Sequence, residues 1–425
     1  MDAREAASTL GVSRSTLYAY VSRGLVRASS EAETRHSRYR RSEIERLALE
    51  RRRARKPALV ARASLDWGRP VLNSALTLIA EGRLYYRGRD AVELAADATL
   101  EQAAALLWNC APGAPTAPAP PAVDLAPLRA LAGLADTRRC TAAFAWLVAV
   151  DATVAVNAVD TVDAVDAGAA SCTRLLRLMT AVMSGRAPTR APIHRQLARA
   201  WGLDERGGEL LRRALVLCAD HELNASSFAA RCVASTGADL GACVLAGLTA
   251  LSGSRHGGVT ALVEDLWTRS APSAAAANRV ASALAGALER TRLPAAGHLR
   301  GSGLPGFGHP LYPDGDPRAQ AILEALPSAQ RHPRLCGAVH DRTGLRPSLD
   351  YALVALRRHL GLPEGHAYRL FALGRTVGWI AHVLEQRRDN VLIRPRAAYV
   401  GERPDTAIAA SPPPSAPASR IIRRR

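Results

Sequence analysis

The chain has 425 residues, with 56 Lys and Arg against 38 Asp and Glu and a formal net charge of +18. Hydrophobic residues make up 48% of it and charged residues 22%, a composition that excludes a generally disordered chain. Aromatic residues make up 4%, too few for the stacking surface that binds single-stranded nucleic acid, and no uncharged apolar run is long enough to span a bilayer. We therefore expect a cytoplasmic globular protein without membrane contact.

The basic excess is concentrated at the two ends of the chain. Residues 1–56 carry a net charge of +7, and the last six residues include four arginines. An acidic partner such as double-stranded DNA is therefore expected to bind the N-terminal segment rather than the body of the chain. The seven cysteines are scattered without CxxC spacing, which predicts reduced core residues and neither disulfides nor a zinc site.

The first predicted elements form a helix-turn-helix. Residues 3–10 favour a short amphipathic helix, Gly11 favours a tight turn, and Ser13 is the expected N-cap of a second helix. Ser42 and Glu45 then form a capping box that opens a third helix through residue 55.

The polar face of the second helix and the basic strip after it are expected to contact DNA. The expected contacts are Arg14, Ser15, Tyr18, Arg38 and Arg40. The run from Ala6 to Tyr18, together with Ser37-Arg-Tyr-Arg, resembles the MerR-type winged helix-turn-helix. A helical interaction module that never meets DNA is the alternative, because a fold alone does not establish function.

The rest of the chain is predicted to be all-α. Pro57 ends the basic helical stretch and marks a domain boundary, and beyond it apolar residues recur at i, i+3 and i+4 in segments such as 91–108 and 368–384. Alternating strand patterns are scarce, which favours a body built from helices. The proline-rich run 111–122 predicts a loop, and residues 410–425 predict a disordered basic tail.

Short motifs in this helical body combine His, Asp or Arg with small residues. His309 lies between Gly308 and Pro310 and must be on a loop, where such mixtures are more often sites than packing. Arg375 has apolar neighbours in the middle of a predicted helix, where a buried arginine requires an anionic partner. The other motifs are Cys218-Ala-Asp-His-Glu-Leu-Asn-Ala-Ser-Ser, Leu251-Ser-Gly-Ser-Arg-His-Gly-Gly, Ser348-Leu-Asp-Tyr and Ile393-Arg-Pro-Arg.

Each motif also has a purely structural interpretation. His221 fits a satisfied core histidine, His256 fits the start of the next helix, and Asp350 fits a carboxylate that complements a helix dipole. The GxGxxG match at 301–306 has no preceding strand, and Pro305 interrupts the helix that should follow, which argues against a dinucleotide site. No cluster of His, Cys and Asp has ligand spacing, so no metal is expected.

Taken together, the motifs resemble the citrate synthase family in order and spacing, from about residue 78 to residue 401. The resemblance implies an all-α homodimer with a large helical domain, residues 57–256 and 347–409, and a small domain, residues 257–346, that closes over the substrate. The implied activity is the tricarboxylic acid cycle reaction that condenses acetyl-CoA with oxaloacetate and water to citrate and CoA. Acetyl-CoA is then a substrate, and no cofactor is expected.

The same resemblance implies three catalytic roles. Asp350 looks like the base that removes a methyl proton of acetyl-CoA, His256 looks like the donor that stabilises the enol, and His309 resembles the group that polarises the ketone of oxaloacetate. This chemistry requires a carboxylate near the carbon acid and a donor on each carbonyl oxygen. The helix N-terminus is expected to keep Asp350 ionised.

The resemblance also implies how oxaloacetate is held. Guanidinium groups suit its two carboxylates because each can bind bidentately. The implied contacts are His221, Arg318, Arg375 and Arg394 of the partner subunit.

One position departs from the family pattern, and two other functions stay open. Pro313 stands where many members have a Lys or Arg that contacts CoA phosphate, which leaves Arg300 or Arg255 as substitutes. Propionyl-CoA is the alternative substrate, giving a 2-methylcitrate synthase, because one methylene is discriminated only by pocket shape. The third alternative is a DNA-binding regulator whose synthase-like body senses oxaloacetate, citrate or acyl-CoA.

Overall fold

A computed structural model describes residues 1–22, 26, 28–30, 37–39, 41, 44, 72–116, 121–151, 165–271, 273–291, 304–397, 399 and 401. The chain divides into two compact units: residues 1–62 with 394–425, here the N-terminal unit, and residues 63–393, here the large unit. Most of the predicted third helix over 42–55, Arg40, Arg300 and the predicted tail lie outside the described residues.

The N-terminal unit contains the predicted helix-turn-helix. Its described elements are α1 (Ala3–Leu10), α2 (Arg14–Ser22) and the antiparallel strands β1 (Ala28–Ser30) and β2 (Ser37–Tyr39). Asp2 caps α1 by accepting two backbone N–H groups of its first turn, and Gly11 ends it in the left-handed region at φ 62°. The two helices pack on a small core of their own, formed by Ala6, Ala7, Leu10, Leu17, Val26, Tyr39 and Ile44.

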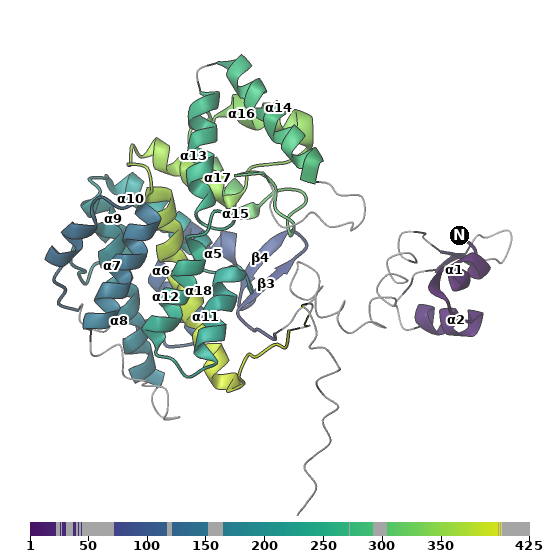
Figure 1. The fold of residues 1–425 in the computed structure, drawn as a ribbon, viewed down its shortest axis with the longest axis horizontal. Coiled ribbons are helices and arrows are strands. Elements are labelled where there is room, and N and C mark those ends of the chain that lie inside the picture. The colour runs from purple at the N-terminus through teal and green to yellow at the C-terminus, as the bar shows by residue number, and fades with distance from the viewer. Residues whose placement is uncertain are drawn as a thin grey trace, which may run out of the picture. The chain divides into compact units, whose positions relative to one another are not determined.

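The large unit is helical, as its sequence pattern predicts (Figure 1). Its α-helices are α5 (Ala91–Asp97), α6 (Leu100–Trp108), α7 (Asp136–Val150), α8 (Val165–Ser184), α9 (Ile193–Ala200), α10 (Glu205–Cys218), α11 (Ala225–Ala234), α12 (Leu240–Leu251), α13 (Val259–Ser270), α14 (Ala274–Thr291), α15 (Pro317–Glu324), α16 (Pro333–Thr343), α17 (Leu349–His359) and α18 (His366–Asp389). Two 3₁₀ turns, η1 (Ala126–Leu131) and η2 (Ser328–Arg331), and a small antiparallel sheet of β3 (Thr77–Ala80), β4 (Arg83–Tyr86) and β5 (Arg89–Asp90) complete the described elements.

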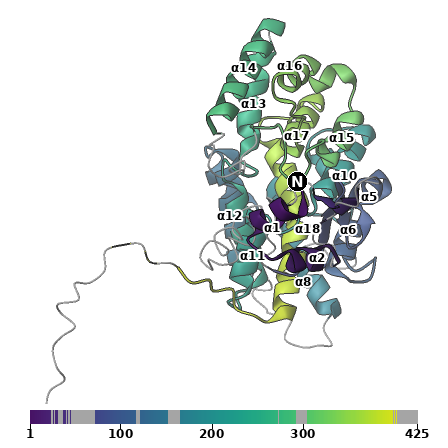
Figure 2. The same ribbon diagram turned by 90° about the vertical axis from the view of Figure 1, so that its right-hand side faces the viewer.

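Helix α18 runs through the middle of the large unit (Figures 1 and 2). Most of its 24 residues are buried, and it packs against α6, α8, α10, α11, α12 and α17. Two glycines on one face let the end of α10 approach closely: a Cβ at Gly374 would lie 2.6 Å from the Cβ of Cys218, and one at Gly378 would lie 2.5 Å from the carbonyl oxygen of Ala219. The residues just after α10 are therefore seated on α18.

Helices α13, α14 and α16 gather at one end of the large unit in both views (Figures 1 and 2). All three come from the stretch 257–346 that was expected to form a small domain, and those domain boundaries stay a prediction. Phe307 forms a local bridge with Leu304 and a second bridge with Pro347, just after the end of this stretch. Within the described ranges, no helix is long and apolar enough to cross a membrane.

Candidate active site

His256 lies on a tight loop between α12 and α13. A Cβ at Gly258 would lie 2.4 Å from a backbone carbonyl oxygen at the end of α12, so the loop requires glycine there. The Nε2 atom of His256 lies 2.9 Å from Ser226 Oγ and 3.3 Å from Asn224 Oδ1. Burial, and secondarily the charge of Arg375, lowers the pKa of His256 to about 3. The imidazole is therefore neutral near pH 7.

The polar groups that face His256 come from the start of α11. Asn224 is the N-cap, and its Oδ1 accepts the backbone N–H groups of Ser226 and Ser227 at 3.0 and 3.1 Å. Trp379 on α18 donates its indole N–H to Ser226 Oγ at 3.0 Å. The sequence reasoning did not assign Asn224 or Ser226 to the site, although an Asn two residues before a Ser in a His-containing motif is a recognisable capping signal.

His309 lies on a loop, as its Gly and Pro neighbours predict. Gly306 and Gly308 have φ values of 79° and 74°, in the left-handed region that favours glycine. The Gly308 N–H donates to the carbonyl oxygen of Arg346 at 2.8 Å, and the Ser348 N–H donates to that of Gly306 at 2.9 Å. The histidine loop is thus paired with the segment that leads into α17.

His221, His309 and Tyr312 form a ring cluster in which His221 and Tyr312 are buried and His309 is partly buried. The rings of His221 and His309 meet edge to face with centroids 4.9 Å apart, and His221 Nε2 lies 3.0 Å from the Tyr312 hydroxyl. Burial, with the Arg318 charge second, lowers the pKa of His309 to about 4 and that of His221 well below its usual value. Tyr312 was missed from the sequence; its position three residues after His309 in the same loop was the available signal.

Arg318 is the second residue of α15 and is buried beside an acidic partner. Its Nε and Nη2 donate to the two carboxylate oxygens of Asp316 at 2.9 and 2.7 Å, a bidentate pair. Burial acts to raise the pKa of Asp316, but the Arg318 guanidinium outweighs it and holds that pKa below its usual value. Asp316 also accepts the Leu349 N–H at 3.2 Å, which ties Arg318 to the first turn of α17.

Asp350 lies in that first turn of α17, as predicted, behind the N-cap residue Ser348. Its Oδ1 atom is inaccessible and has no hydrogen-bond partner among the described residues. Burial raises the pKa of Asp350 to about 6, with Arg318 opposing the rise and Asp316 adding to it. The helix N-terminus therefore does not hold this carboxylate at its usual pKa, yet at pH 7 about nine tenths of it is ionised.

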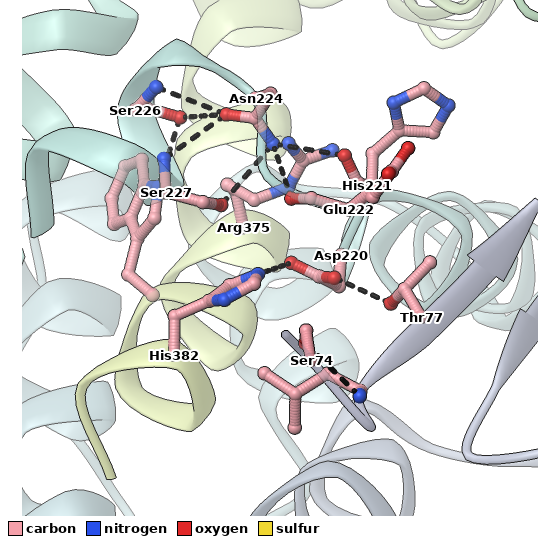
Figure 3. Close-up of polar contacts among 12 residues, drawn as sticks. Ser74, Thr77, Asp220, His221, Glu222, Asn224, Ser226, Ser227, Arg375 and His382 are labelled. Atoms are coloured by element: carbon pink, nitrogen blue, oxygen red, sulfur yellow. Dashed lines mark hydrogen bonds and ion pairs between the residues drawn. The ribbon is translucent and has the colours of Figure 1, made fainter. Parts of the chain in front are cut away.

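Arg375 projects from the middle of α18 and is 1% exposed. Its Nε donates to the carbonyl oxygen of Cys218 at 2.9 Å, its guanidinium lies 5.1 Å from the centre of the Phe371 ring, and its Nη2 has no hydrogen-bond partner in the described ranges. Burial lowers its pKa, and the carboxylate of Asp220 opposes this. Figure 3 shows Arg375 beside the segment that carries His221 and Asn224. A buried cation with an unused donor is suited to an anionic ligand.

The structure brings six predicted site residues of the large unit together. They are close enough to perturb one another's ionisation: His221, His256, His309, Arg318, Asp350 and Arg375. Arg394 is exposed in the segment after α18, so its role in a partner subunit's site stays a prediction. No group of three His, Cys, Asp or Glu side chains in the described part of the chain could hold a metal ion.

The predicted DNA contacts are only partly described. Arg14, Ser15 and Tyr18 are exposed on α2, while Leu17 between them is buried in the core of the N-terminal unit. Arg38 lies in β2, and Arg40 lies outside the described residues. The second helix thus presents the polar face that the sequence predicted.

The family model described as citrate synthase, C-terminal domain, matches residues 65–396, and a helix-turn-helix domain model matches residues 1–52. The first match covers well over half of the chain. This chain belongs to the citrate synthase family. It carries in addition an N-terminal helix-turn-helix domain, as the resemblance implied.

Relatives and solved structures agree with this assignment. The chain is 36% identical over 205 residues to the citrate synthase of Haloferax volcanii (46% of this chain, 51% of the relative) and 33% identical over 200 residues to 2-methylcitrate synthase 1 of Corynebacterium glutamicum (44% and 49%). The chain thus spans about half the length of the curated relatives it matches. The crystal structure of Thermotoga maritima citrate synthase superposes with a TM-score of 0.61 at 25% identity, covering 79% of this chain and 94% of that one.

A second solved structure shows the fold alone. It is the ternary complex of carboxymethyl coenzyme A and oxaloacetate with the citrate synthase of Thermoplasma acidophilum, with a TM-score of 0.64 at 23% identity, covering 80% of this chain and 96% of that chain. The predicted all-α citrate synthase fold, preceded by a helix-turn-helix domain, is confirmed.

Proposed function

We propose that this chain condenses an acyl-CoA with oxaloacetate, with acetyl-CoA as the substrate, and releases citrate and CoA. One observation carries the proposal: a carboxylate with an unpartnered buried oxygen, Asp350, shares a site with two buried arginines and three neutral histidines. Such a site provides a base, hydrogen-bond donors and positive charge in one place.

The residues divide the work as follows. Asp350 removes a proton from the carbon next to the thioester, and its raised pKa of about 6 makes it a better base than an ordinary carboxylate while it stays largely ionised at pH 7. His256, neutral at that pH, donates a hydrogen bond to the thioester oxygen as negative charge develops there. The carbanion carbon then forms a bond with the ketone carbon of oxaloacetate, whose oxygen receives a hydrogen bond and a proton from His309.

Two arginines hold the dianionic substrate. Arg375 offers its Nη2, which has no hydrogen-bond partner among the described residues, and Arg318, which pairs with Asp316 through Nε and Nη2, offers its Nη1. Each binds one carboxylate of oxaloacetate, and His221 lines the space between them. Water then cleaves the thioester of the condensation product, giving citrate and the free thiol of CoA.

Arg255, exposed beside His256, is the proposed substitute for the CoA phosphate contact missing at Pro313.

A thiol-release assay with acetyl-CoA and oxaloacetate tests the proposal. The unaltered chain should release thiol only when both substrates are present, and Asp350→Ala should reduce the rate by about 10²- to 10⁴-fold, the usual contribution of a general base. Asp341→Asn, which changes an exposed carboxylate on α16, is the matched control and should leave the rate unchanged. A folded chain that releases no thiol, or full activity in Asp350→Ala, contradicts the proposal.

Propionyl-CoA is the second acyl substrate to test. Relatives named citrate synthase and 2-methylcitrate synthase match at nearly the same identity, 36% and 33%. One methylene in an apolar pocket changes kcat/KM by about 10- to 200-fold. The ratio of kcat/KM for the two thioesters decides between the activities, and a larger value for propionyl-CoA would make the chain a 2-methylcitrate synthase.

We also propose a homodimer in which Arg394 of the partner subunit completes each site. Asp350→Ala and Arg394→Ala chains can be mixed under conditions that exchange subunits. If Arg394 acts across the interface, a mixed dimer contains one site with both residues intact, and activity should return to a fraction of the unaltered level. No recovery in a sample shown to contain mixed dimers contradicts the arrangement.

The helix-turn-helix domain suggests a second function, binding of double-stranded DNA. The supporting observation is the exposed polar face of α2, with Arg14, Ser15 and Tyr18 outward and Leu17 buried. Affinity for duplex DNA should fall steeply between 50 and 200 mM salt and should weaken in Arg14→Ser. Affinity that is absent, or independent of salt, would leave the domain as a helical interaction module. Citrate formation measured with and without DNA then separates an enzyme from a metabolite-sensing regulator.

A further inference from the structure

A buried acid and imidazole lie behind the substrate site, and none of the roles above uses them. Asp220 and His382 are both fully buried, and Asp220 Oδ1 lies 3.3 Å from His382 Nε2 (Figure 3). The other carboxylate oxygen, Oδ2, accepts the hydroxyl of Thr77 at 2.5 Å. Among the described residues, His382 has no hydrogen-bond partner of good geometry at either ring nitrogen. A buried imidazole with a single acidic neighbour requires an explanation.

The two side chains connect the elements that carry the oxaloacetate contacts. Asp220 immediately precedes His221 after α10, and His382 lies seven residues after Arg375, two turns along the same face of α18. Thr77 is the first residue of β3, so its hydrogen bond to Asp220 also connects the sheet to this pair. The pair therefore joins the segment that bears His221 to the helix that bears Arg375.

A glycine on α18 allows the Asp220 carboxylate to lie directly against this helix. A Cβ at Gly378, midway between Arg375 and His382, would lie 2.3 Å from Asp220 Oδ1. Any other residue there would displace the carboxylate from its place beside the helix. Tyr86 supports the segment from the other side, because its hydroxyl lies 3.2 Å from the Asp220 carbonyl oxygen and 3.3 Å from the Asp220 nitrogen.

Among the neighbouring groups, the Asp220 carboxylate has the largest effect in raising the pKa of Arg375 against burial. Burial acts to raise the pKa of Asp220, but His382, Arg375 and the Thr77 hydroxyl outweigh it and keep the carboxylate ionised. Arg375 has no carboxylate within ion-pair distance in the described ranges, and its Nε is held only by a backbone carbonyl. The charge of Asp220 thus partly compensates that of the buried guanidinium without a direct ion pair, and the Nη2 of Arg375 has no hydrogen-bond partner among the described residues.

We propose that Asp220 and His382 are a pair of positioning residues that hold His221 and Arg375 in the geometry that binds oxaloacetate. The inference rests on the proposed function, since oxaloacetate is the ligand that the two positioned residues would contact. Neither member touches substrate. Loss of the pair should therefore weaken oxaloacetate binding and leave the acyl-CoA side of the site, His256 with Asn224 and Ser226, unchanged.

Steady-state kinetics with each substrate varied in turn test the proposal. His382→Leu and Asp220→Asn should each raise the KM for oxaloacetate, by up to about 100-fold if a binding group moves by about 1 Å, with the KM for acetyl-CoA unchanged. His382→Gln places an amide N–H close to the position of Nε2 and should restore most of the affinity. Thr77→Val should act in the same direction with a smaller effect.

A control in the same unit separates positioning from general loss of stability. His194 in α9 is also buried, has no hydrogen-bond partner at either ring nitrogen among the described residues, and likewise lies near one carboxylate, Glu209, at 3.7 Å. His194→Leu should change the melting temperature without altering either KM. If His382→Leu lowers only the melting temperature, raises both KM values by the same factor, or is not improved by His382→Gln, the pair is structural and the proposal is overturned.

Titration calorimetry with oxaloacetate alone distinguishes failure of this inference from failure of the proposed function. Binding by the unaltered chain without turnover would contradict the condensation activity, and the dissociation constants of the variants would still decide the role of the pair. Turnover with normal oxaloacetate affinity in the variants would overturn the positioning role alone. An unaltered chain that neither binds nor converts oxaloacetate would overturn both.

Discussion

Replacing Asp350 by asparagine should remove the base and stabilise the folded chain in one step. Burial raises the pKa of this carboxyl from 3.8 to about 6, so the ionised form is less stable in the folded protein than in the unfolded one. A shift of that size corresponds to about 3 kcal/mol at pH 7, and partial exposure of the side chain reduces the expected gain to about 1–3 kcal/mol. Asparagine has nearly the same shape and carries no charge to bury.

The pH dependence of the gain follows from the sign of the shift. Between pH 3.8 and about 6 the folded chain binds more protons at Asp350 than the unfolded chain, so stability contributed by this group falls as pH rises. The loss of stability caused by burying the ionised Asp350 carboxylate is small below about pH 4, reaches about half its full size at about pH 5 and is nearly complete near pH 7. The stability difference between Asp350→Asn and the unaltered chain should therefore grow from pH 5 to pH 7.

Urea denaturation at fixed protomer concentration measures this difference. The matched control is Asp316→Asn, because Arg318 holds the pKa of Asp316 below its usual value and the ionised carboxylate is stabilising above that range. Breaking this buried pair should cost about 3–5 kcal/mol at pH 7, opposite in sign to the Asp350 effect. If Asp350→Asn is less stable than the unaltered chain at pH 7, the carboxylate is not a strained base and the reasoning fails.

The remaining predictions concern pH, packing and one hydroxyl. The logarithm of kcat/KM should rise with pH and level off above about pH 6 as Asp350 ionises, and a fall between pH 6 and 8 would contradict a neutral His309 with a pKa of about 4. Gly378→Ala should lower the free energy of unfolding by about 2–4 kcal/mol, because the added Cβ would meet backbone and carboxylate oxygens. The control is Gly337→Ala in α16, whose Cβ would meet nothing within 4 Å and which should be neutral or stabilising. Equal melting temperatures for the two variants would refute this. Tyr312→Phe removes the hydroxyl 3.0 Å from a site histidine and should reduce kcat/KM for oxaloacetate by about tenfold, a loss that unchanged kinetics would disprove.

Helix-forming patterns are local, and the sequence predicted them; the expected cap at Ser13 is present, because its Oγ accepts the Thr16 N–H at 3.2 Å, whereas the Ser42–Glu45 capping box lies outside the described residues. The amphipathic spacing of the large unit, the turn at Gly11 and the place of Asp350 in the first turn of a helix depend on residues a few positions apart. The loop around His309 is local in the same sense, because glycine and proline restrict the backbone wherever they stand. The site residues themselves were named from the resemblance of these motifs to the citrate synthase family, because each motif alone also had a structural interpretation.

Partners that come from distant segments could not be predicted in this way. Tyr312 faces His221 across 91 positions, and Thr77 reaches Asp220 across 143, so no spacing rule connects them. The pKa of Asp350 is a similar case: its helix position favours ionisation, and burial among neighbours from α15 and α18 outweighs it.

The sequence by itself determined the helical class, the helix-turn-helix and the family to which the chain belongs. The tertiary structure decided which charges of the site are paired. The sequence indicated that Arg375, among apolar neighbours in a helix, needs an anionic partner, and the family resemblance implied that both Arg318 and Arg375 bind carboxylates. Asp316, two residues away, pairs with Arg318, whereas Arg375 has an Nη2 without a hydrogen-bond partner among the described residues, and the charge of Asp220 opposes the effect of its burial. Electrostatic energy in a buried site depends on distances of a few ångströms, and only the folded chain sets those distances.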